Sequence, residues 1–70
     1  MSYLAICIEE GIKKGWDVSY LIREDWDEDQ ILQILGGLED GLDVSIYAKK
    51  EFNWKEMLKV RFELLKEKRV

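Results

Sequence analysis

The sequence predicts an all-α fold in which three longer helices are joined by two short ones. Three observations lead to this prediction: the chain resembles itself at an offset of 26 residues, two sets of helix-start signals match at that offset, and apolar residues recur three and four apart. Because a fixed period of roughly 20 to 50 residues is typical of stacked repeats, we expect one small helical-repeat domain over residues 1–70.

The internal similarity is clearest around two glycines. Residues 15–19 (GWDVS) return as residues 41–45 (GLDVS), and residues 30–32 (QIL) correspond to residues 56–58 (EML). A repeated unit of this kind buries its apolar face against its neighbours in a stack. The chain accordingly divides into three copies of one unit, the first of them partial: residues 1–14, 15–40 and 41–67.

The first long helix is expected over residues 2–14. Its apolar residues Ala5, Ile8 and Ile12 occupy positions that are also apolar in the later copies. The helix is expected to stop at Gly15, because a residue without a Cβ readily adopts the left-handed conformation that ends many helices.

Short helices are expected over residues 17–22 and 43–48. Asp17 and Asp43 each precede a short apolar run, and an aspartate can accept hydrogen bonds from the first amides of a helix. A β-strand is the alternative, since the valine, isoleucine and tyrosine residues that follow favour strands. We favour a helix, because a single short strand would lack a partner.

The remaining long helices are expected over residues 27–40 and 53–67, where the same start signals occur twice. Each start has an Asp or Asn cap, a Gln or Glu three residues later that completes a capping box, and an aromatic residue before the cap that packs on the first turns. Apolar residues then follow at helical spacing. The cap, box and aromatic residues are Asp27, Gln30 and Trp26 in one helix, and Asn53, Glu56 and Phe52 in the other.

Two adjacent glycines weaken the second long helix, since each costs about 1 kcal/mol relative to alanine. Gly37 matches Gly11 at the 26-residue offset, which predicts a close approach to a neighbouring helix. Gly36 matches Glu10 and Phe62, so the repeat gives no reason for a glycine there.

The last copy resembles a known group of proteins. Residues 38–48 (LEDGLDVSIYA), followed by residues 52–54 (FNW) and Met57, are similar to the short helical repeats of many proteins from Firmicutes, plasmids and phages. Lys50 stands where those repeats commonly have proline. The resemblance implies an α-helical repeat fold and a role in interaction, and it implies no reaction.

Charge is unevenly distributed along the chain. The net charge is −4, but residues 1–43 hold 11 acidic and 3 basic side chains, whereas residues 44–70 hold 4 acidic and 8 basic ones. Such asymmetry favours association with charged partners. Because the acidic part repels phosphate, direct binding of nucleic acid is not expected.

The composition disfavours several classes of function. The chain has no histidine, the commonest general base and metal ligand. Its single cysteine, Cys7, cannot form an internal disulfide, which fits a reducing compartment. No stretch has the length and flanks of a membrane span or a secretion signal. We therefore expect a cytoplasmic protein with no enzyme activity, no cofactor, no bound metal and no membrane association.

The densest acidic run lies at residues 24–29 (EDWDED). Its aspartates alternate as at the start of a calcium loop, but Gln30 and Gly36 stand where such a loop needs glycine and glutamate. Acidic residues also stabilise the first turn of a helix, which is the simplest interpretation. The functional interpretation of the same run is an acidic patch that docks on a basic partner.

An exposed aromatic residue is expected beside this patch. Trp54 occupies the first position of the third long helix, where the preceding copy has Glu28. Large aromatic residues often anchor protein contacts. The predicted partner-binding residues are Glu24, Asp25, Asp27, Glu28, Asp29, Glu39, Asp40 and Trp54.

Two functional hypotheses follow from these features. The first is a protein–protein interaction module whose partner has a basic surface, with head-to-tail or antiparallel self-association as a further property. The second is an inhibitor from a phage or mobile element that imitates nucleic acid and blocks a nucleic-acid-binding enzyme, as anti-CRISPR proteins do. The small size and the acidic run suggest the second hypothesis.

Overall fold

The computed structural model describes residues 2–69, and every regular element in that range is helical. The all-α class is therefore confirmed. No helix in the described range is long and apolar enough to cross a membrane. In chain order the elements are the helices α1 (Tyr3–Lys14), α2 (Ser19–Ile22) and α3 (Glu28–Glu39), the 3-10 helix η1 (Val44–Ile46) and the helix α4 (Trp54–Arg69).

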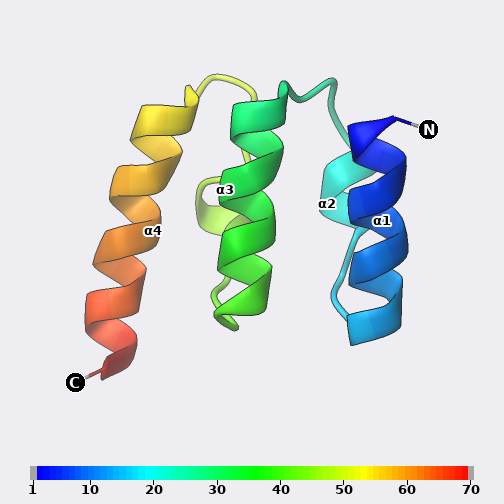
Figure 1. Cartoon of the computed structure of the whole chain (residues 1–70). Helices are drawn as coiled ribbons and strands as arrows, with labels where there is room; N and C mark the ends of the chain where they lie inside the picture. The colour runs from blue at the N-terminus through cyan, green and yellow to red at the C-terminus, as the bar shows by residue number, and fades with distance from the viewer. Residues whose placement is uncertain (1, 70) are drawn as a thin grey trace.

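The long helices α1, α3 and α4 stand side by side and run in the same direction (Figure 1). The short helices α2 and η1 lie behind them and return the chain to the end at which the next long helix begins. The middle helix α3 packs against all four other elements. The fold thus has two layers, and the front of the long helices is left open.

The long helices start where the capping residues are. The Asp27 carboxylate accepts from the Gln30 amide at 2.8 Å, and the Gln30 side-chain oxygen accepts from the Asp27 amide at 3.1 Å. Asn53 and Glu56 make the same reciprocal pair at 2.9 and 3.1 Å. Both predicted capping boxes are confirmed. The Gln30 side chain also donates from Nε2 to the backbone oxygen of Phe52 at 2.9 Å, which ties the start of α3 to the segment before α4.

The glycines that follow α1 and α3 adopt the left-handed conformation, as expected. Gly15 has φ 77° and Gly41 has φ 72°. In each case the amide of the next residue, Trp16 or Leu42, donates a hydrogen bond to a backbone carbonyl of the preceding helix at 2.9 Å. This hydrogen bond ends the long helix and turns the chain toward the second layer.

Gly11 and Gly37 allow the second layer to approach the first. A Cβ on Gly11 would collide with Cγ1 of Val18, and a Cβ on Gly37 would lie 2.6 Å from Cγ1 of Val44 and collide with the Tyr47 hydroxyl. The predicted close approach is therefore present, and its partner is the short helix that follows each long one.

The two short helices are shorter than the expected ranges of 17–22 and 43–48. Asp17 lies ahead of α2, with its carboxylate accepting from the amide and the hydroxyl of Ser19 at 3.1 and 2.6 Å. These hydrogen bonds lower the pKa of Asp17. Because the aspartate occupies a turn before the helix, α2 keeps only one turn, and no strand forms in the described residues.

The second short segment is a three-residue 3-10 helix and not an α-helix over 43–48. Asp43 again precedes it and accepts from the Ser45 amide at 3.2 Å. The turn ends early because the buried Tyr47 side chain points to α3, where its hydroxyl donates to the backbone oxygen of Gln33 at 2.6 Å.

The core lies between the two layers. Trp26 and Ile31 belong to one buried cluster, as expected for an aromatic residue that packs on the first turns of a helix. The Trp26 indole also donates to the Tyr20 backbone oxygen at 2.8 Å. The most deeply buried side chains are Leu21, Ile34, Val44, Tyr47 and Met57.

Candidate functional site: an apolar groove across the central helix

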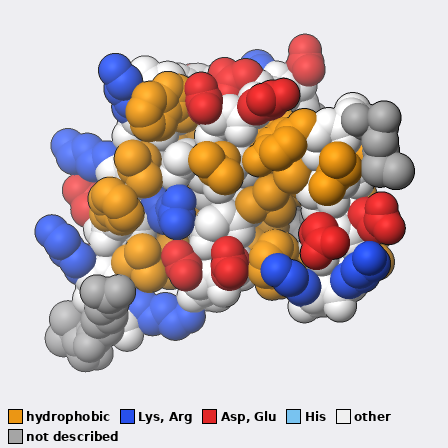
Figure 2. Space-filling model, in the orientation of Figure 1, with side chains coloured by type: hydrophobic (Ala, Val, Ile, Leu, Met, Phe, Trp, Pro, Cys, Tyr) orange, Lys and Arg blue, Asp and Glu red, His pale blue; other side chains and the backbone are white. Residues whose placement is uncertain are grey.

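The open face of the long helices carries large apolar side chains. Figure 2 shows hydrophobic side chains gathered over α3 and along the lines where it meets its neighbours. Leu32 on α3 and Phe62 on α4 each expose 52% of their surface, and Ile6 on α1 is also exposed. Contiguous apolar surface of this kind on a small protein commonly marks an interaction site.

A shallow groove of about 430 Å³ crosses this face. Four of its residues belong to α3 at helical spacing, so they form one stripe on the side opposite η1. Trp16 closes the groove from the segment after α1, and Arg61 closes it from α4. The lining residues are Trp16, Leu32, Leu35, Gly36, Glu39 and Arg61.

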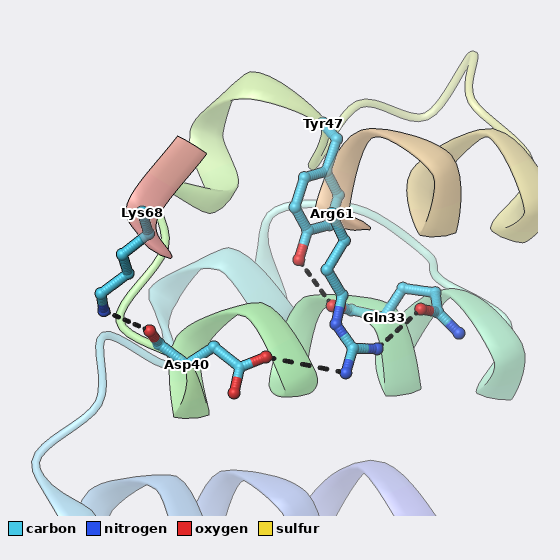
Figure 3. A network of polar contacts seen from close by, with 5 residues as sticks. All are labelled: Gln33, Asp40, Tyr47, Arg61 and Lys68. Carbon is cyan, nitrogen blue, oxygen red and sulfur yellow. Dashed lines mark hydrogen bonds and ion pairs between the residues drawn. The ribbon is translucent and has the colours of Figure 1, made fainter. Parts of the chain in front are cut away.

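Arg61 reaches from α4 to α3, where it meets Gln33 and Asp40 (Figure 3). Its Nη1 donates to the side-chain oxygen of Gln33 at 2.9 Å, and its Nη2 lies 3.8 Å from a carboxylate oxygen of Asp40. The Nε atom is buried without a hydrogen-bond partner among the described residues. The guanidinium therefore forms a fixed, partly neutralised wall of the groove.

Gly36 makes this position of Arg61 possible. A Cβ at residue 36 would lie 2.5 Å from the Arg61 Cζ and 2.6 Å from its Nη1. The glycine that the repeat did not explain is therefore matched to a residue one copy later. The signal in the sequence was a pair: an arginine on the apolar stripe of the third long helix, where the preceding copy has Leu35, and a glycine where the other copies have larger residues.

Tyr47 supports the same region from behind. Burial raises the pKa of Tyr47 to about 12, although the positive charge of Arg61 acts in the opposite direction. The phenol consequently stays neutral and keeps donating to the Gln33 backbone. Gln33 is thus held at its main chain by Tyr47 and at its side chain by Arg61 (Figure 3).

The predicted acidic residues fall into two groups at opposite ends of α3. Residues 24–29 surround its start, whereas Glu39 and Asp40 lie at its end, and a 12-residue helix separates them. A helix of this length spans roughly 18 Å. The structure therefore does not bring the predicted acidic residues together into one patch.

The first acidic group combines exposed carboxylates with structural roles. Glu24, Asp25, Glu28 and Asp29 are exposed, and none is within ion-pairing distance of a described basic group. Asp27 is used as the cap of α3.

The second acidic group is divided in function. Glu39 is exposed and lines the groove. Asp40 is half-buried, and besides its contact with Arg61 its backbone oxygen accepts from Lys68. Asp40 therefore orients the arginine wall and is less available to a partner.

Trp54 lies at the start of α4, at the same end of the molecule as the start of α3 (Figure 1). It exposes 36% of its surface, and the Lys55 ammonium lies 5.7 Å from its ring. Trp54 and the first acidic group therefore lie at the same end of the molecule.

Comparison with protein-family models, with curated proteins and with solved structures gave no match. Within the described residues, no three acidic or cysteine side chains converge as metal ligands would.

Proposed function

We propose that this protein is a non-catalytic binding module that holds a segment of another protein in the front groove. The observation that carries the proposal is the exposed stripe of α3. Along it an apolar centre, Leu32 and Leu35, is bordered by Glu28 at one end and Glu39 at the other. These four residues are spaced four, three and four apart, so they share one helix face.

The stripe specifies the chemistry of the partner. Glu28 and Glu39 are eleven residues apart on one helix, which places them about 16 Å from each other. A complementary segment has an apolar side chain at its centre and basic side chains toward both ends. This agrees with the basic partner surface expected from the sequence, and Trp54 offers an aromatic contact near the Glu28 end.

The openness of the groove favours a protein segment over a small molecule. Small-molecule sites usually enclose most of their ligand. Here the floor residue Leu32 is half exposed, and Arg61 is already occupied by Gln33 and Asp40. An apolar side chain of a partner can bury Leu32 without displacing these contacts.

Selection from a library of displayed peptides tests the proposal. Purified protein should enrich segments with an apolar centre and basic ends, and Leu32→Glu should abolish the enrichment. Ile46→Glu is the matched control, because Ile46 is 46% exposed but belongs to η1 in the second layer. Equal capture by both variants, with circular dichroism showing both folded, would remove the groove as the binding site.

We also propose that the chain belongs with the short helical-repeat proteins that its last copy resembles. Several contacts recur at the 26-residue offset and support this assignment. The Asp17–Ser19 hydrogen bond recurs as Asp43–Ser45, and Gly41 repeats the left-handed turn of Gly15. A cytoplasmic location is part of the same proposal, in keeping with the single buried Cys7 thiol.

A second candidate function rests on a different observation, the unpaired carboxylates around the start of α3. Five acidic residues within residues 24–29 present negative charge at one end of the molecule. An inhibitor that imitates nucleic acid would offer such charge to the phosphate-binding site of an enzyme. Competition with DNA or RNA for a purified nuclease, abolished by Asp25→Lys and Asp29→Lys together, would support this role. Simultaneous binding of the inhibitor and the nucleic acid would contradict it.

A further inference from the structure

The Arg61 guanidinium lies with one flat face on α3. A Cβ placed on Gly36 would lie 2.5, 2.6 and 2.7 Å from Cζ, Nη1 and Nη2 of Arg61. A point in the plane of the guanidinium at this distance from Cζ would be clearly nearer to one of the nitrogen atoms. The nearly equal distances therefore place the Cβ position above the plane, and the missing side chain of Gly36 leaves the space in which the guanidinium covers the helix.

The edges of the same guanidinium are already occupied or buried (Figure 3). Nη1 donates to Gln33, Nη2 faces the Asp40 carboxylate, and Nε is buried. The Arg61 side chain nevertheless keeps 21% of its surface exposed and lines the groove. What it offers to a ligand is therefore mainly its second flat face, which carries positive charge and few free donors.

Trp16 forms the opposite wall of the groove and is held in place by residues of α1. Its Cε3 atom lies 3.7 Å from the position of a Cβ on Gly11, and the Lys14 ammonium lies 4.9 Å from its ring centre. Leu32 and Leu35 lie between the two walls. The groove of about 430 Å³ thus combines a flat cation, an indole and aliphatic side chains.

The repeat does not account for this arrangement. The earlier copy has Leu35 at the position of Arg61, and the counterparts of Gly36 are Glu10 and Phe62. Gly36 lowers the propensity of α3 to form a helix, and the buried Nε lacks a hydrogen-bond partner among the described residues. Residues that break local rules in this way are typical of functional positions.

We propose that the groove binds an aromatic side chain at the centre of the partner segment, with Arg61 stacked on its ring and Trp16 beside it. This inference rests on the proposed function and specifies the apolar centre of that segment. The face of an aromatic ring is negative and attracts a cation within about 6 Å of its centre. A guanidinium suits this contact because it is planar and weakly hydrated. An aliphatic side chain would gain only the contacts with Leu32 and Leu35.

A carboxylate suits the groove less well. Carboxylates bind arginine best through two parallel N–H donors, and on Arg61 the donor edges face Gln33 and Asp40. Glu39 on the groove would also repel an anion. An aromatic ring needs no donor and adds no negative charge, so it is compatible with a segment whose basic ends match Glu28 and Glu39.

The central position of the selected peptides tests the inference. Wild-type protein should enrich phenylalanine, tyrosine or tryptophan there over aliphatic residues by at least roughly threefold. Arg61→Leu and Arg61→Gln should lose this preference but still enrich apolar centres. Two variants are used so that one misfolded protein, recognised by circular dichroism, leaves the other informative. Phe62→Leu is the matched control, because Phe62 is 52% exposed beside Arg61 but does not line the groove.

The outcomes separate this inference from the function on which it rests. Enrichment of aliphatic centres with basic ends by the wild type would overturn the aromatic anchor and leave the groove as a binding site. An aromatic preference that persists in a folded Arg61 variant would overturn the stacking role of Arg61. No enrichment of any segment would contradict the proposed function itself.

Peptides with altered rings test the electrostatic cause. An enriched peptide is made with phenylalanine, pentafluorophenylalanine or cyclohexylalanine at its centre, and binding is measured by fluorescence anisotropy. Fluorination removes the negative charge from the ring face, and cyclohexylalanine keeps the size without the π system. The wild type should bind the phenylalanine peptide at least roughly threefold more tightly than the other two, and Arg61→Leu should bind all three within about twofold. Equal binding of the three peptides by the wild type would overturn the inference.

Discussion

The segments at residues 15–40 and 41–67 are similar in sequence at the 26-residue offset, and they share some contacts and differ in others. The contacts that are shared and those that differ have different roles. The shared residues, such as Gly15 and Gly41 or Val18 and Val44, shape the backbone within or next to their own copy. Some of the residues that differ add contacts between copies that have no equivalent elsewhere among the described residues. Arg61, where the earlier copy has Leu35, crosses to Gln33 and Asp40.

This comparison indicates how the sequence specifies the register in which the long helices pack side by side. Identical copies could pack in more than one register, whereas a contact that needs Gly36 in one copy and Arg61 in the next can form in only one. The same differences create the groove. Substitutions that exchange residues between copies therefore test the comparison directly.

The largest effect is expected at the two adjacent glycines. Gly37→Ala should destabilise the fold by about 2–3 kcal/mol, because the new Cβ meets Val44 and Tyr47 in the packed core. Gly36→Ala meets only the end of the Arg61 side chain, which would have to give up its contacts with Gln33 and Asp40. Because the helix also gains about 1 kcal/mol of propensity, we expect a smaller loss than for Gly37→Ala. Urea unfolding of the two variants measures the difference. Similar losses for both would show that the two glycines do not have separate roles.

The next effect concerns the two capping boxes. Gln30→Glu gives the earlier box the glutamate of the later one, but it removes the donor to the Phe52 backbone and places a charge on a buried side chain. We expect a loss of about 2 kcal/mol near neutral pH. Glu56→Gln, at the exposed box, should change stability by less than about 0.5 kcal/mol. An equal loss of stability in the two variants would mean that the hydrogen bond between Gln30 and Phe52 contributes nothing to the stability of the fold.

A smaller effect is expected at Tyr47, whose counterpart Leu21 has no hydroxyl. Tyr47→Phe should cost about 1 kcal/mol through the lost hydrogen bond to Gln33. The folded pKa of about 12 lies above the ordinary value of 10.0. Folding therefore favours the neutral phenol, and this contribution is complete below pH 10 and falls as the pH rises toward 12.

Absorbance at 295 nm can follow the phenol directly. One of the three tyrosines should resist ionisation until about pH 12 in the wild type, and that component should be missing from Tyr47→Phe. A wild-type titration complete by pH 11 would contradict the buried position of the hydroxyl.

The smallest effect on stability is expected at a position in the first turn of the long helices where one helix has an acidic residue and the other a basic one. Asp29 on α3 corresponds to Lys55 on α4. Asp29→Lys should lower stability by about 0.5 kcal/mol, and Lys55→Asp should raise it by a similar amount, because acidic residues stabilise the first turn of a helix. Thermal unfolding at low salt measures both changes, and they should shrink in 1 M sodium chloride.

Much of the fold could be predicted from the sequence because its signals are local. Capping pairs such as Asp27 and Gln30, and the left-handed residue Gly15, act within a few residues and repeat at a fixed offset. The short segments were expected to be longer than they are. Their ends depend on contacts with α3, and a local pattern does not report those.

The candidate site was less predictable. The sequence placed Glu28, Glu39 and Trp54 among the binding residues but did not show that one helix separates the two groups of acids. It also left Gly36 unexplained, because its partner Arg61 lies 25 positions later and meets it only when the copies stack. Residues that differ between the copies, such as Gly36 and Arg61, can be recognised as parts of one site only when the packing of the copies is known.

The common direction of α1, α3 and α4 has an electrical consequence. Each long helix carries a macrodipole equivalent to roughly half an elementary charge at either end, and parallel helices add these where antiparallel neighbours would cancel them. The fold therefore has a positive pole where α3 begins and a negative pole where α1 and α4 end. Residues 24–29 place carboxylates at the first pole, and Lys13, Lys14 and Lys68 place ammonium groups at the second.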